Sequence, residues 1–317
     1  MDEHFKMNEE RIIVSKENDC KLLDIPVPIF ICAPMVRYSK LPFRKLVKQY
    51  GCDLTYTPMI YASCFLASEK CRNVEFTTEQ GDNPIVQFAA KTPVEFADAA
   101  ELVYSQSRGI DLNCGCPKRD VRSGGFGSQL LDSPELIADI VRQTRARISN
   151  PEYSISVKIR IQYPLEKTIS LCQQIEKAGA THISIHGRTR DMRNEMPDYE
   201  AISLVKSSIQ IPVYANGGIK NYEEALSVAH KTKVDGIMVA DALLSNPALF
   251  GGHLSTPKQC IRDWLEIEAN KGISFESFHQ HLIFMVRSCL PKAQRIFFNE
   301  LTSTLAVKDF LSDILLS

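Results

Sequence analysis

The sequence predicts an α/β protein, a (β/α)8 (TIM) barrel followed by a small C-terminal all-helical domain. Short apolar segments alternate with longer amphipathic segments eight times over about 220 residues. An open, doubly wound sheet is the competing architecture, but no Gly-x-Gly-x-x-Gly follows the first apolar segment and the repeat continues to eight. Beyond Pro257 the pattern is helical alone. Together these observations favour the closed barrel.

The individual elements follow from apolar periodicity and from residues typical of helix ends. Pro93 and Pro134 suit the first turn of a helix, and Ser133 is a candidate N-cap. Gly51 and Gly179 suit positions just after a helix. The predicted strands are 29–35, 53–57, 85–89, 110–113, 155–160, 182–186, 213–215 and 236–240. The predicted helices between them are 42–50, 93–105, 134–149, 165–178, 199–207 and 222–230.

Three parts of the chain are expected. Residues 1–24 are polar and charged and are predicted to form a flexible N-terminal tail. Residues 25–252 form the barrel. Residues 253–317 form the helical domain, with helices at 258–270, 274–288 and 293–316, the last broken near Ser303.

Composition restricts the classes of function. The chain is 44% apolar and 24% charged with a net charge of −1, so any affinity for nucleic acid must come from local clusters of Lys and Arg. Ten cysteines occur without a Cys-x-x-Cys pair, which predicts no zinc or iron–sulfur site. No secretory leader and no membrane-spanning apolar run are recognised. We expect a cytoplasmic protein, with a nuclear location as the alternative.

The most informative stretch runs from Gly109 to Leu131. It begins as a buried strand, breaks into a turn at Asn113-Cys114-Gly115-Cys116-Pro117, and crosses a glycine-rich loop before the next helix. A thiol at a strand end, beside a proline that fixes the backbone, is a candidate for chemistry, although an inert core thiol is the alternative.

Several motifs together resemble the tRNA-dihydrouridine synthase family. Asn-x-Gly-Cys-Pro, followed by Gly-x-Gly and Leu-Leu, is similar to the active-site signature of that family, and five further blocks agree in order between Ile29 and Phe250. Those blocks are Ala33–Ser39 with Pro42–Arg44, Gln87 in IVQF, Lys158 in VKIR, His186–Thr189 and Asn216–Gly218.

The resemblance implies an activity and its cofactors. Reduction of the uracil C5–C6 bond needs a hydride, which no side chain supplies, so FMN reduced by NADPH or NADH is implied. By motif match the catalytic residue is Cys116, the general acid that protonates C5. The implied flavin contacts are Pro34, Met35, Val36, Gln87, Lys158, His186, Asn216, Gly217, Gly218, Ala240 and Asp241. The implied substrate contacts are Asn113, Arg160 and Arg188.

One position departs from the family pattern. Members typically carry Gly-Arg or Ala-Arg where this chain has Ala240-Asp241. A carboxylate there removes a bidentate phosphate partner and adds like-charge repulsion, so either another cation substitutes or FMN is held weakly.

The resemblance also implies tRNA as partner, with the helical domain as a tRNA-binding domain. The motifs are most similar to the eukaryotic branch acting at D-loop positions 20a and 20b. Two alternatives stay open: an FMN barrel acting on a small molecule, like dihydroorotate dehydrogenase, and a non-catalytic RNA-binding relative that has lost FMN. Basic residues at the predicted barrel mouth would contact phosphates; they are Arg37, Lys40, Lys118, Arg119, Arg122, Arg160, Arg188, Arg190 and Arg193.

Overall fold

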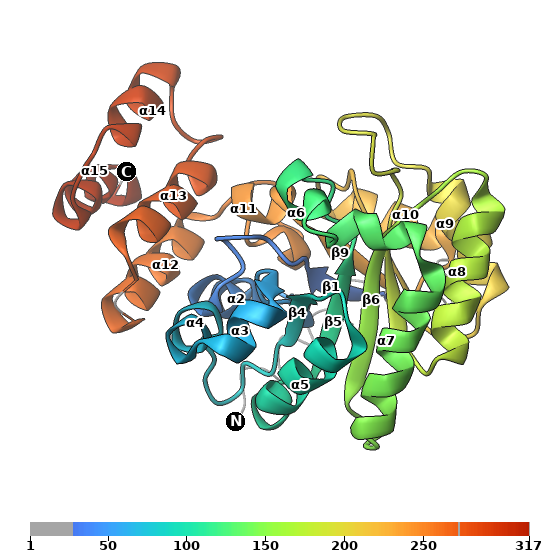
Figure 1. Ribbon diagram of the computed structural model, residues 1–317. Helices are drawn as coiled ribbons and strands as arrows, with labels where there is room; N and C mark the ends of the chain where they lie inside the picture. Colours follow the sequence, from blue (N-terminus) through green and yellow to red (C-terminus); the bar gives the residue numbers. More distant parts are fainter. Residues whose placement is uncertain (1–27, 272, 317) are drawn as a thin grey trace.

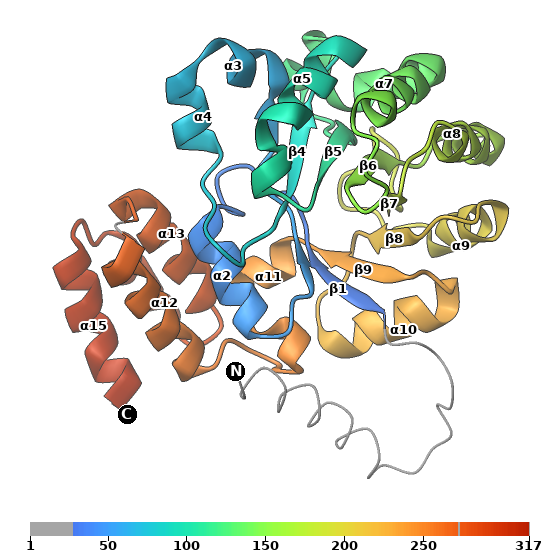
Figure 2. The ribbon, with the colours of Figure 1, turned by 90° about the horizontal axis from the view of Figure 1, so that it is seen from below.

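The structure, a computed structural model, describes residues 28–271 and 273–316. The predicted N-terminal tail, residues 1–24, lies outside the described residues. Parallel strands stand side by side around a common axis with helices on the outside, as the end-on view shows (Figure 2). The predicted α/β barrel is therefore confirmed.

All neighbouring strands are parallel, in the order β2-β1-β9-β8-β7-β6-β5-β4-β3. A bridge between Tyr56, just after β2, and Ile85, at the start of β4, closes the ring, and β3 is an extra strand that pairs with the end of β4. The strands are β1 (Ile29–Cys32), β2 (Leu54–Thr55), β3 (Ile60–Tyr61), β4 (Ile85–Ala89), β5 (Gly109–Cys114), β6 (Ser154–Arg160), β7 (His182–His186), β8 (Val213–Asn216) and β9 (Gly236–Val239).

The helices around the barrel agree with the predicted ones to within two residues at each end. They are α2 (Leu41–Gln49), α5 (Pro93–Val103), α7 (Pro134–Arg147), α8 (Leu165–Lys177), α9 (Tyr199–Ser208) and α10 (Tyr222–Thr232). Gly51 and Gly179 have φ values of 89° and 99°, as expected after a helix. Ser133 occupies the N-cap position of α7 as predicted, although its side chain makes no capping hydrogen bond.

Several short elements were not predicted. They are polar or too short to show a clear period, and they sit in the connections between strands and helices. They are α3 (Ala62–Ala67), α4 (Glu69–Glu75), α6 (Arg119–Ser123), α11 (Asp241–Ser245) and the 3₁₀ turns Tyr104–Gln106, Gly127–Asp132 and Leu249–Gly251.

Side chains alternate between the two faces of the barrel wall. In β5, Ile110, Leu112 and Cys114 join the core between strands and helices, whereas Asp111 and Asn113 bond to side chains of neighbouring strands inside the barrel. Low in the barrel the interior is closed by an apolar cluster of Ile31, Ala33, Leu54, Tyr56, Ile85, Tyr214 and Met238. The polar interior positions above this cluster carry the site.

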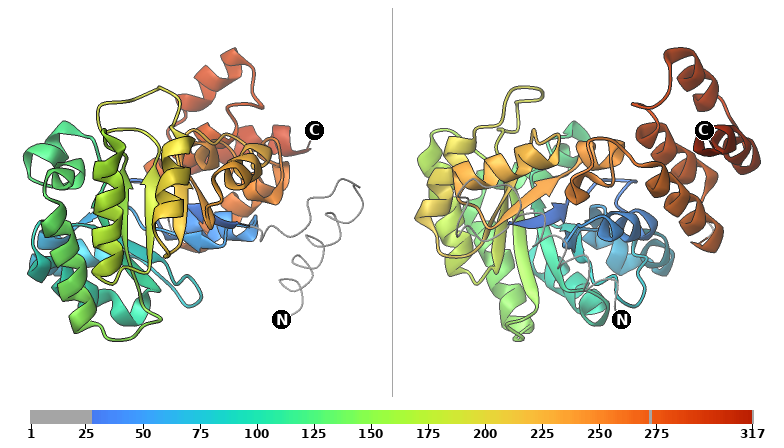
Figure 3. Two further views of the ribbon diagram at one scale, coloured as in Figure 1. Left: turned by 90° about the vertical axis from the view of Figure 1, so that its right-hand side faces the viewer. Right: turned by 180° about the vertical axis from the view of Figure 1, so that it is seen from behind.

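The chain after the barrel forms a separate group of helices beside α2 and α11 (Figures 1 and 3). Trp264 is buried there, and the His281 ring stacks on Phe43 of the barrel with centroids 4.6 Å apart. The break near Ser303 is confirmed; the position of the domain boundary stays a prediction. These helices are α12 (Lys258–Lys271), α13 (Phe275–Met285), α14 (Lys292–Asn299) and α15 (Thr304–Leu316).

Within the described residues, no helix is both long and apolar enough to span a bilayer.

A buried ion pair ties α2 to the loop before β4. The Arg44 guanidinium and the Asp82 carboxylate are both almost fully buried, and Arg44 also donates to the carbonyls of Ser39 at 2.8 Å and Thr77 at 2.7 Å. Removing one partner leaves an uncompensated buried charge.

We therefore expect Asp82→Ala to lower the free energy of unfolding by about 3–5 kcal/mol. Asp139→Ala, which breaks an exposed pair with Arg142 on α7, should cost less than about 1 kcal/mol. Urea denaturation of both variants measures the difference. Equal losses in the two variants would contradict the assigned role of the Arg44–Asp82 pair.

Candidate functional site at the carboxyl ends of the strands

The residues singled out by sequence gather at one rim of the barrel. Parallel strands all end on the same side, and α6, α11 and the loop between β7 and α9 lie together at that rim, along the top in Figure 1. Cys116 follows β5, His186 and Asn216 end β7 and β8, and Lys158 lies two residues before the end of β6. The closed ring therefore brings together residues up to 100 positions apart in sequence.

The Cys116 loop is held by the side chain of Asn113. Its amide oxygen accepts the backbone N–H groups of Gly115 at 3.2 Å and Cys116 at 3.0 Å, which turns the chain sharply at the end of β5. Cys116 is partly exposed, unlike the buried Cys114 two residues earlier. The loop thus presents one thiol of the pair to the rim.

The glycine-rich loop packs directly on Cys116. Ser128 N donates to Cys116 O at 3.0 Å, and Gly127 has a φ of 61°. A Cβ on Gly127 would lie 2.8 Å from Cys116 O and 3.0 Å from Cys116 Cβ. Glycine is required here both for the backbone angle and for the close approach.

Gln87 finds its hydrogen-bond partners on the neighbouring strand. Its Nε2 donates to Asp111 Oδ2 at 2.7 Å, and its Oε1 accepts from Asn113 Nδ2 at 2.7 Å. Both bonds are to side chains of β5, and the predicted contact of Gln87 with a flavin stays a prediction. Asp111 was not predicted to belong to the site. Its only signal in the sequence is that it is a charged residue between two apolar residues of a predicted strand.

Lys158 projects into the barrel from β6. Its Nζ donates to Asn216 Oδ1 at 2.8 Å, and Asn216 Nδ2 in turn donates to Met238 O at 2.8 Å. Burial, with repulsion from Arg160, lowers the pKa of Lys158 to about 8, while Asp111 and Cys116 act in the opposite direction. Lys158 is thus a partly desolvated cation within electrostatic reach of the candidate thiol.

His186 and the glycine pair after β8 form one compact unit. A Cβ on Gly217 would lie 2.6 Å from the His186 ring, and one on Gly218 would lie 2.8 Å from Pro197. Burial, followed by the nearby cations, lowers the pKa of His186 to about 2, so the ring is neutral. The backbone N–H groups of Gly217 and Gly218 donate to no other described residue. They are therefore available to an anion.

A basic hollow of about 1110 Å³ opens beside Cys116. Six cations line it against two carboxylates, Asp120 and Asp191. The predicted cluster is only partly assembled: Arg37 and Lys40 line a different groove against α13, and Arg188 does not line the hollow. We call this cavity the basic hollow. Its six cations are Lys118, Arg119, Arg122, Arg160, Arg190 and Arg193.

Arg160 and Arg188, the predicted substrate contacts, are engaged by the protein itself. Arg160 donates to Gly115 O at 2.8 Å and Thr189 O at 2.9 Å, joining the Cys116 loop to the loop after β7. Arg188 lies 3.2 Å from His186 Nε2 and donates to Glu195 O. Their contact with a substrate stays a prediction.

The first loop brings its residues to the same rim. Pro34 is partly exposed, Met35 is buried and Val36 is exposed. Ser39 fixes the turn by accepting Met35 N at 3.0 Å. Whether these residues touch a flavin stays a prediction.

Asp241 begins α11 directly after Ala240, with an exposed side chain that bonds to no described residue. It sits at the same rim, at the carboxyl end of β9. No cation neutralises this carboxylate within the described residues.

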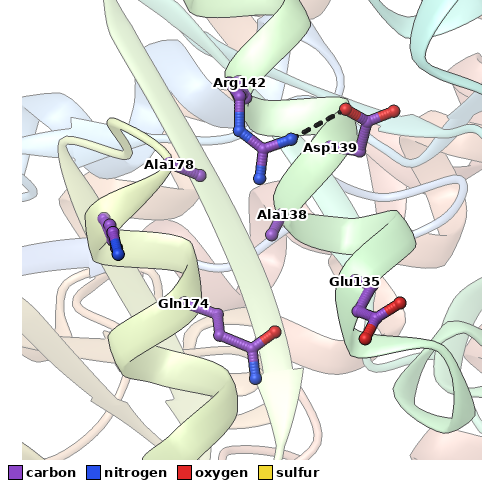
Figure 4. Close-up of a pocket in the computed structure, with 7 residues that line it drawn as sticks. Glu135, Ala138, Asp139, Arg142, Gln174 and Ala178 are labelled. Carbon is purple, nitrogen blue, oxygen red and sulfur yellow. Dashed lines mark hydrogen bonds and ion pairs between the residues drawn. The ribbon is translucent and has the colours of Figure 1, made fainter.

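A second hollow lies away from the rim, on the outer wall between α7 and α8 (Figure 4). Its polar side chains are Glu135, Asp139, Arg142, Gln174 and Lys177, with Arg142 paired to Asp139. None of the predicted site residues lines it.

Comparison with known proteins identifies the family. The dihydrouridine synthase family model matches residues 31–306. The chain belongs to the dihydrouridine synthase family. A Caenorhabditis elegans protein described as an uncharacterized tRNA-dihydrouridine synthase-like protein is 53% identical over 89% of this chain and 99% of its own length. A human protein described as tRNA-dihydrouridine(20a/20b) synthase [NAD(P)+]-like is 47% identical over 89% of this chain and 90% of its own.

Solved structures agree on the fold. The old yellow enzyme of Trypanosoma cruzi superposes with a TM-score of 0.50 at 11% identity, covering 69% of this chain and 86% of that one. At that identity the likeness supports the barrel architecture of this dihydrouridine synthase family member alone.

The contact between Gly127 and Cys116 generates a test. Gly127→Ala combines an unfavourable φ with a clash against the Cys116 backbone, so we expect a loss of about 2–4 kcal/mol in unfolding free energy. Gly125→Ala shares a positive φ of 84° but would meet nothing nearer than 3.8 Å, so it should lose about 1–2 kcal/mol. Chemical denaturation measures both, and a Gly125→Ala variant as unstable as Gly127→Ala would refute the packing argument.

Proposed function

We propose that this protein is a tRNA-dihydrouridine synthase that reduces the C5–C6 double bond of D-loop uridines, at positions 20a and 20b, with FMN and with NADPH or NADH as reductant. The observation that carries the proposal is the thiol of Cys116, held at the carboxyl-end rim within electrostatic reach of Lys158 and Arg160, in a chain of this family. Relatives named for this activity, with 20a/20b and NAD(P)+ in their names, support it.

The donor set suits FMN. Gln87, Asn113 and Lys158 offer N–H groups toward carbonyl and nitrogen acceptors of a flavin ring, and Gly217 and Gly218 offer free backbone N–H groups to its phosphate. Their positive φ values, and the contacts that a Cβ would make with His186 and Pro197, require glycine at both positions. When bound, FMN supplies the hydride that no side chain can.

The side chains of the chain itself supply the rest of the chemistry. Cys116 donates a proton to C5 of the uracil, held in place by Asn113 and by the loop around Gly127. Lys158 stabilises negative charge that develops beside it, which its desolvated surroundings strengthen. His186, neutral because of its burial, can donate or accept a hydrogen bond but carries no charge.

The basic hollow is the proposed docking surface for tRNA phosphates. Three of its cations, Lys118, Arg119 and Arg193, are exposed, and the hollow adjoins Cys116, so a nucleotide released from its stack could reach the rim from there. The C-terminal helices are the proposed second contact with tRNA.

One observation favours a second candidate. Asp241 places an exposed carboxylate where the family pattern has arginine, which fits a relative that binds tRNA without retaining FMN. The visible spectrum of the purified protein, before and after FMN is added, separates the two: a colourless protein that gains no bound flavin supports the second candidate.

Loss of the thiol tests the primary proposal. Cys116→Ala should slow dihydrouridine formation about 10²- to 10⁴-fold while flavin stays bound, because a general acid is removed and the donor set is not. Cys114→Ala removes a buried core thiol at the end of β5, two residues before Cys116, and should keep turnover near the parent value. Dihydrouridine assays on unmodified tRNA measure both, and a parental rate in Cys116→Ala would refute the proton-donor role.

Charge removal tests the docking surface. Arg119→Gln in the basic hollow should weaken tRNA binding and reduce the slope of log Kd against log salt by about 1. Arg142→Gln removes an equally exposed arginine from the hollow between α7 and α8 and should leave the slope unchanged. Equal effects of the two substitutions would exclude the basic hollow as the docking surface.

A further inference from the structure

A buried carboxylate lies inside the barrel beneath the site. Asp111 on β5 is fully buried, and its partners are the amide of Gln87 at 2.7 Å and the hydroxyl of Ser156 at 2.7 Å. Desolvation raises the pKa of Asp111 to about 6, while its two hydrogen bonds and the Lys158 cation oppose that rise, so the group is ionised at neutral pH. The mechanism above uses no carboxylate at this position.

This charge fixes the direction of a chain of hydrogen bonds. An ionised carboxylate only accepts, so Gln87 must turn its NH₂ group toward Asp111 and its oxygen toward Asn113. Asn113 must then donate to Gln87 and leave its own oxygen for the N–H groups of Gly115 and Cys116. Three consecutive links thus run from Asp111 to the backbone of the thiol residue.

The opposite direction of these hydrogen bonds is excluded both at the Asp111 end and at the end formed by the Gly115 and Cys116 N–H groups. If the two amides were reversed, the Gln87 oxygen would face the Asp111 carboxylate and the Asn113 NH₂ group would face two backbone N–H groups. In the observed direction each amide keeps one N–H that is not used in the chain. Both amides therefore act as donors toward whatever binds over them.

We propose that Asp111 is a positioning residue of the reaction: its carboxylate anchors the Gln87 amide and, through Asn113, holds Cys116 in place. The inference deepens the proposed function and rests on it for the reaction that is served. The hold on Cys116 itself can be measured without substrate.

Ser156 provides a test that is specific for polarity. Asp111→Asn can keep the direction, because its carbonyl accepts from Gln87 while its N–H turns to the Ser156 hydroxyl, which also lies 3.2 Å from Ile110 O. Ser156→Ala alone leaves the Asp111 carboxylate as the acceptor of the Gln87 N–H. The double variant Asp111→Asn/Ser156→Ala removes the partner that orients the new amide, so the direction is fixed only by the two backbone N–H groups at the Asn113 end.

The experiment compares four proteins with the parent: Asp111→Val, Asp111→Asn, Ser156→Ala and the double variant. Iodoacetamide labelling, followed by peptide mass spectrometry at Cys116, reports the hold on the thiol without tRNA. We expect each conservative single variant within about threefold of the parent in labelling rate and kcat. We expect Asp111→Val and the double variant to change labelling several-fold and to lower kcat about tenfold or more, with a smaller change in KM for tRNA.

The outcomes are distinguishable. Effects of the double variant that equal the product of the two single effects, or parental Cys116 labelling in Asp111→Val, would overturn the proposal. If Asp111→Val does not fold, the double variant, which leaves the sizes of both side chains nearly unchanged, carries the test alone. If the parent protein forms no dihydrouridine, the proposed function fails, and the labelling pattern still decides whether Asp111 positions Cys116.

Discussion

The structure depends on how hydrogen-bonding groups inside a closed parallel barrel are satisfied. The two-residue period of the strands points polar side chains inward, where little water reaches them, so each must bond to a neighbouring strand. Asp111, Gln87 and Asn113 meet this demand in sequence across β4 and β5, and Lys158 and Asn216 meet it across β6 and β8. The same bonds that make burial tolerable orient the groups at the rim.

Closure of the barrel brings these hydrogen-bonded side chains from different strands together in one site. Eight parallel strands must end at the same rim, so the Cys116 loop, Lys158, His186 and the glycines after β8 face a common space. The fold alone does not define the chemistry, because many activities share such barrels. What distinguishes this chain is a thiol beside a desolvated lysine, with a basic hollow next to them.

The rim combines backbone groups suited to an anion with a negatively charged side chain nearby. Gly217 and Gly218 are free to bind an anion through their backbone, yet Asp241 adds an exposed carboxylate at the end of the neighbouring strand. The helices beside α2 contact it through the ring of His281, which packs against Phe43 and Trp264.

The sequence by itself determined the barrel, the helix boundaries and the strand-end positions of Cys116, Lys158, His186 and the Gly217–Gly218 pair, because periodicity and short motifs are local properties. It did not determine which polar groups pair. Gln87 bonds to Asp111 and Asn113 on another strand, Arg160 clamps two loops, and Arg37 and Lys40 lie in a groove apart from the basic hollow. Those outcomes depend on strand register and ring closure, which bring distant residues within hydrogen-bond distance and exist only in the tertiary structure.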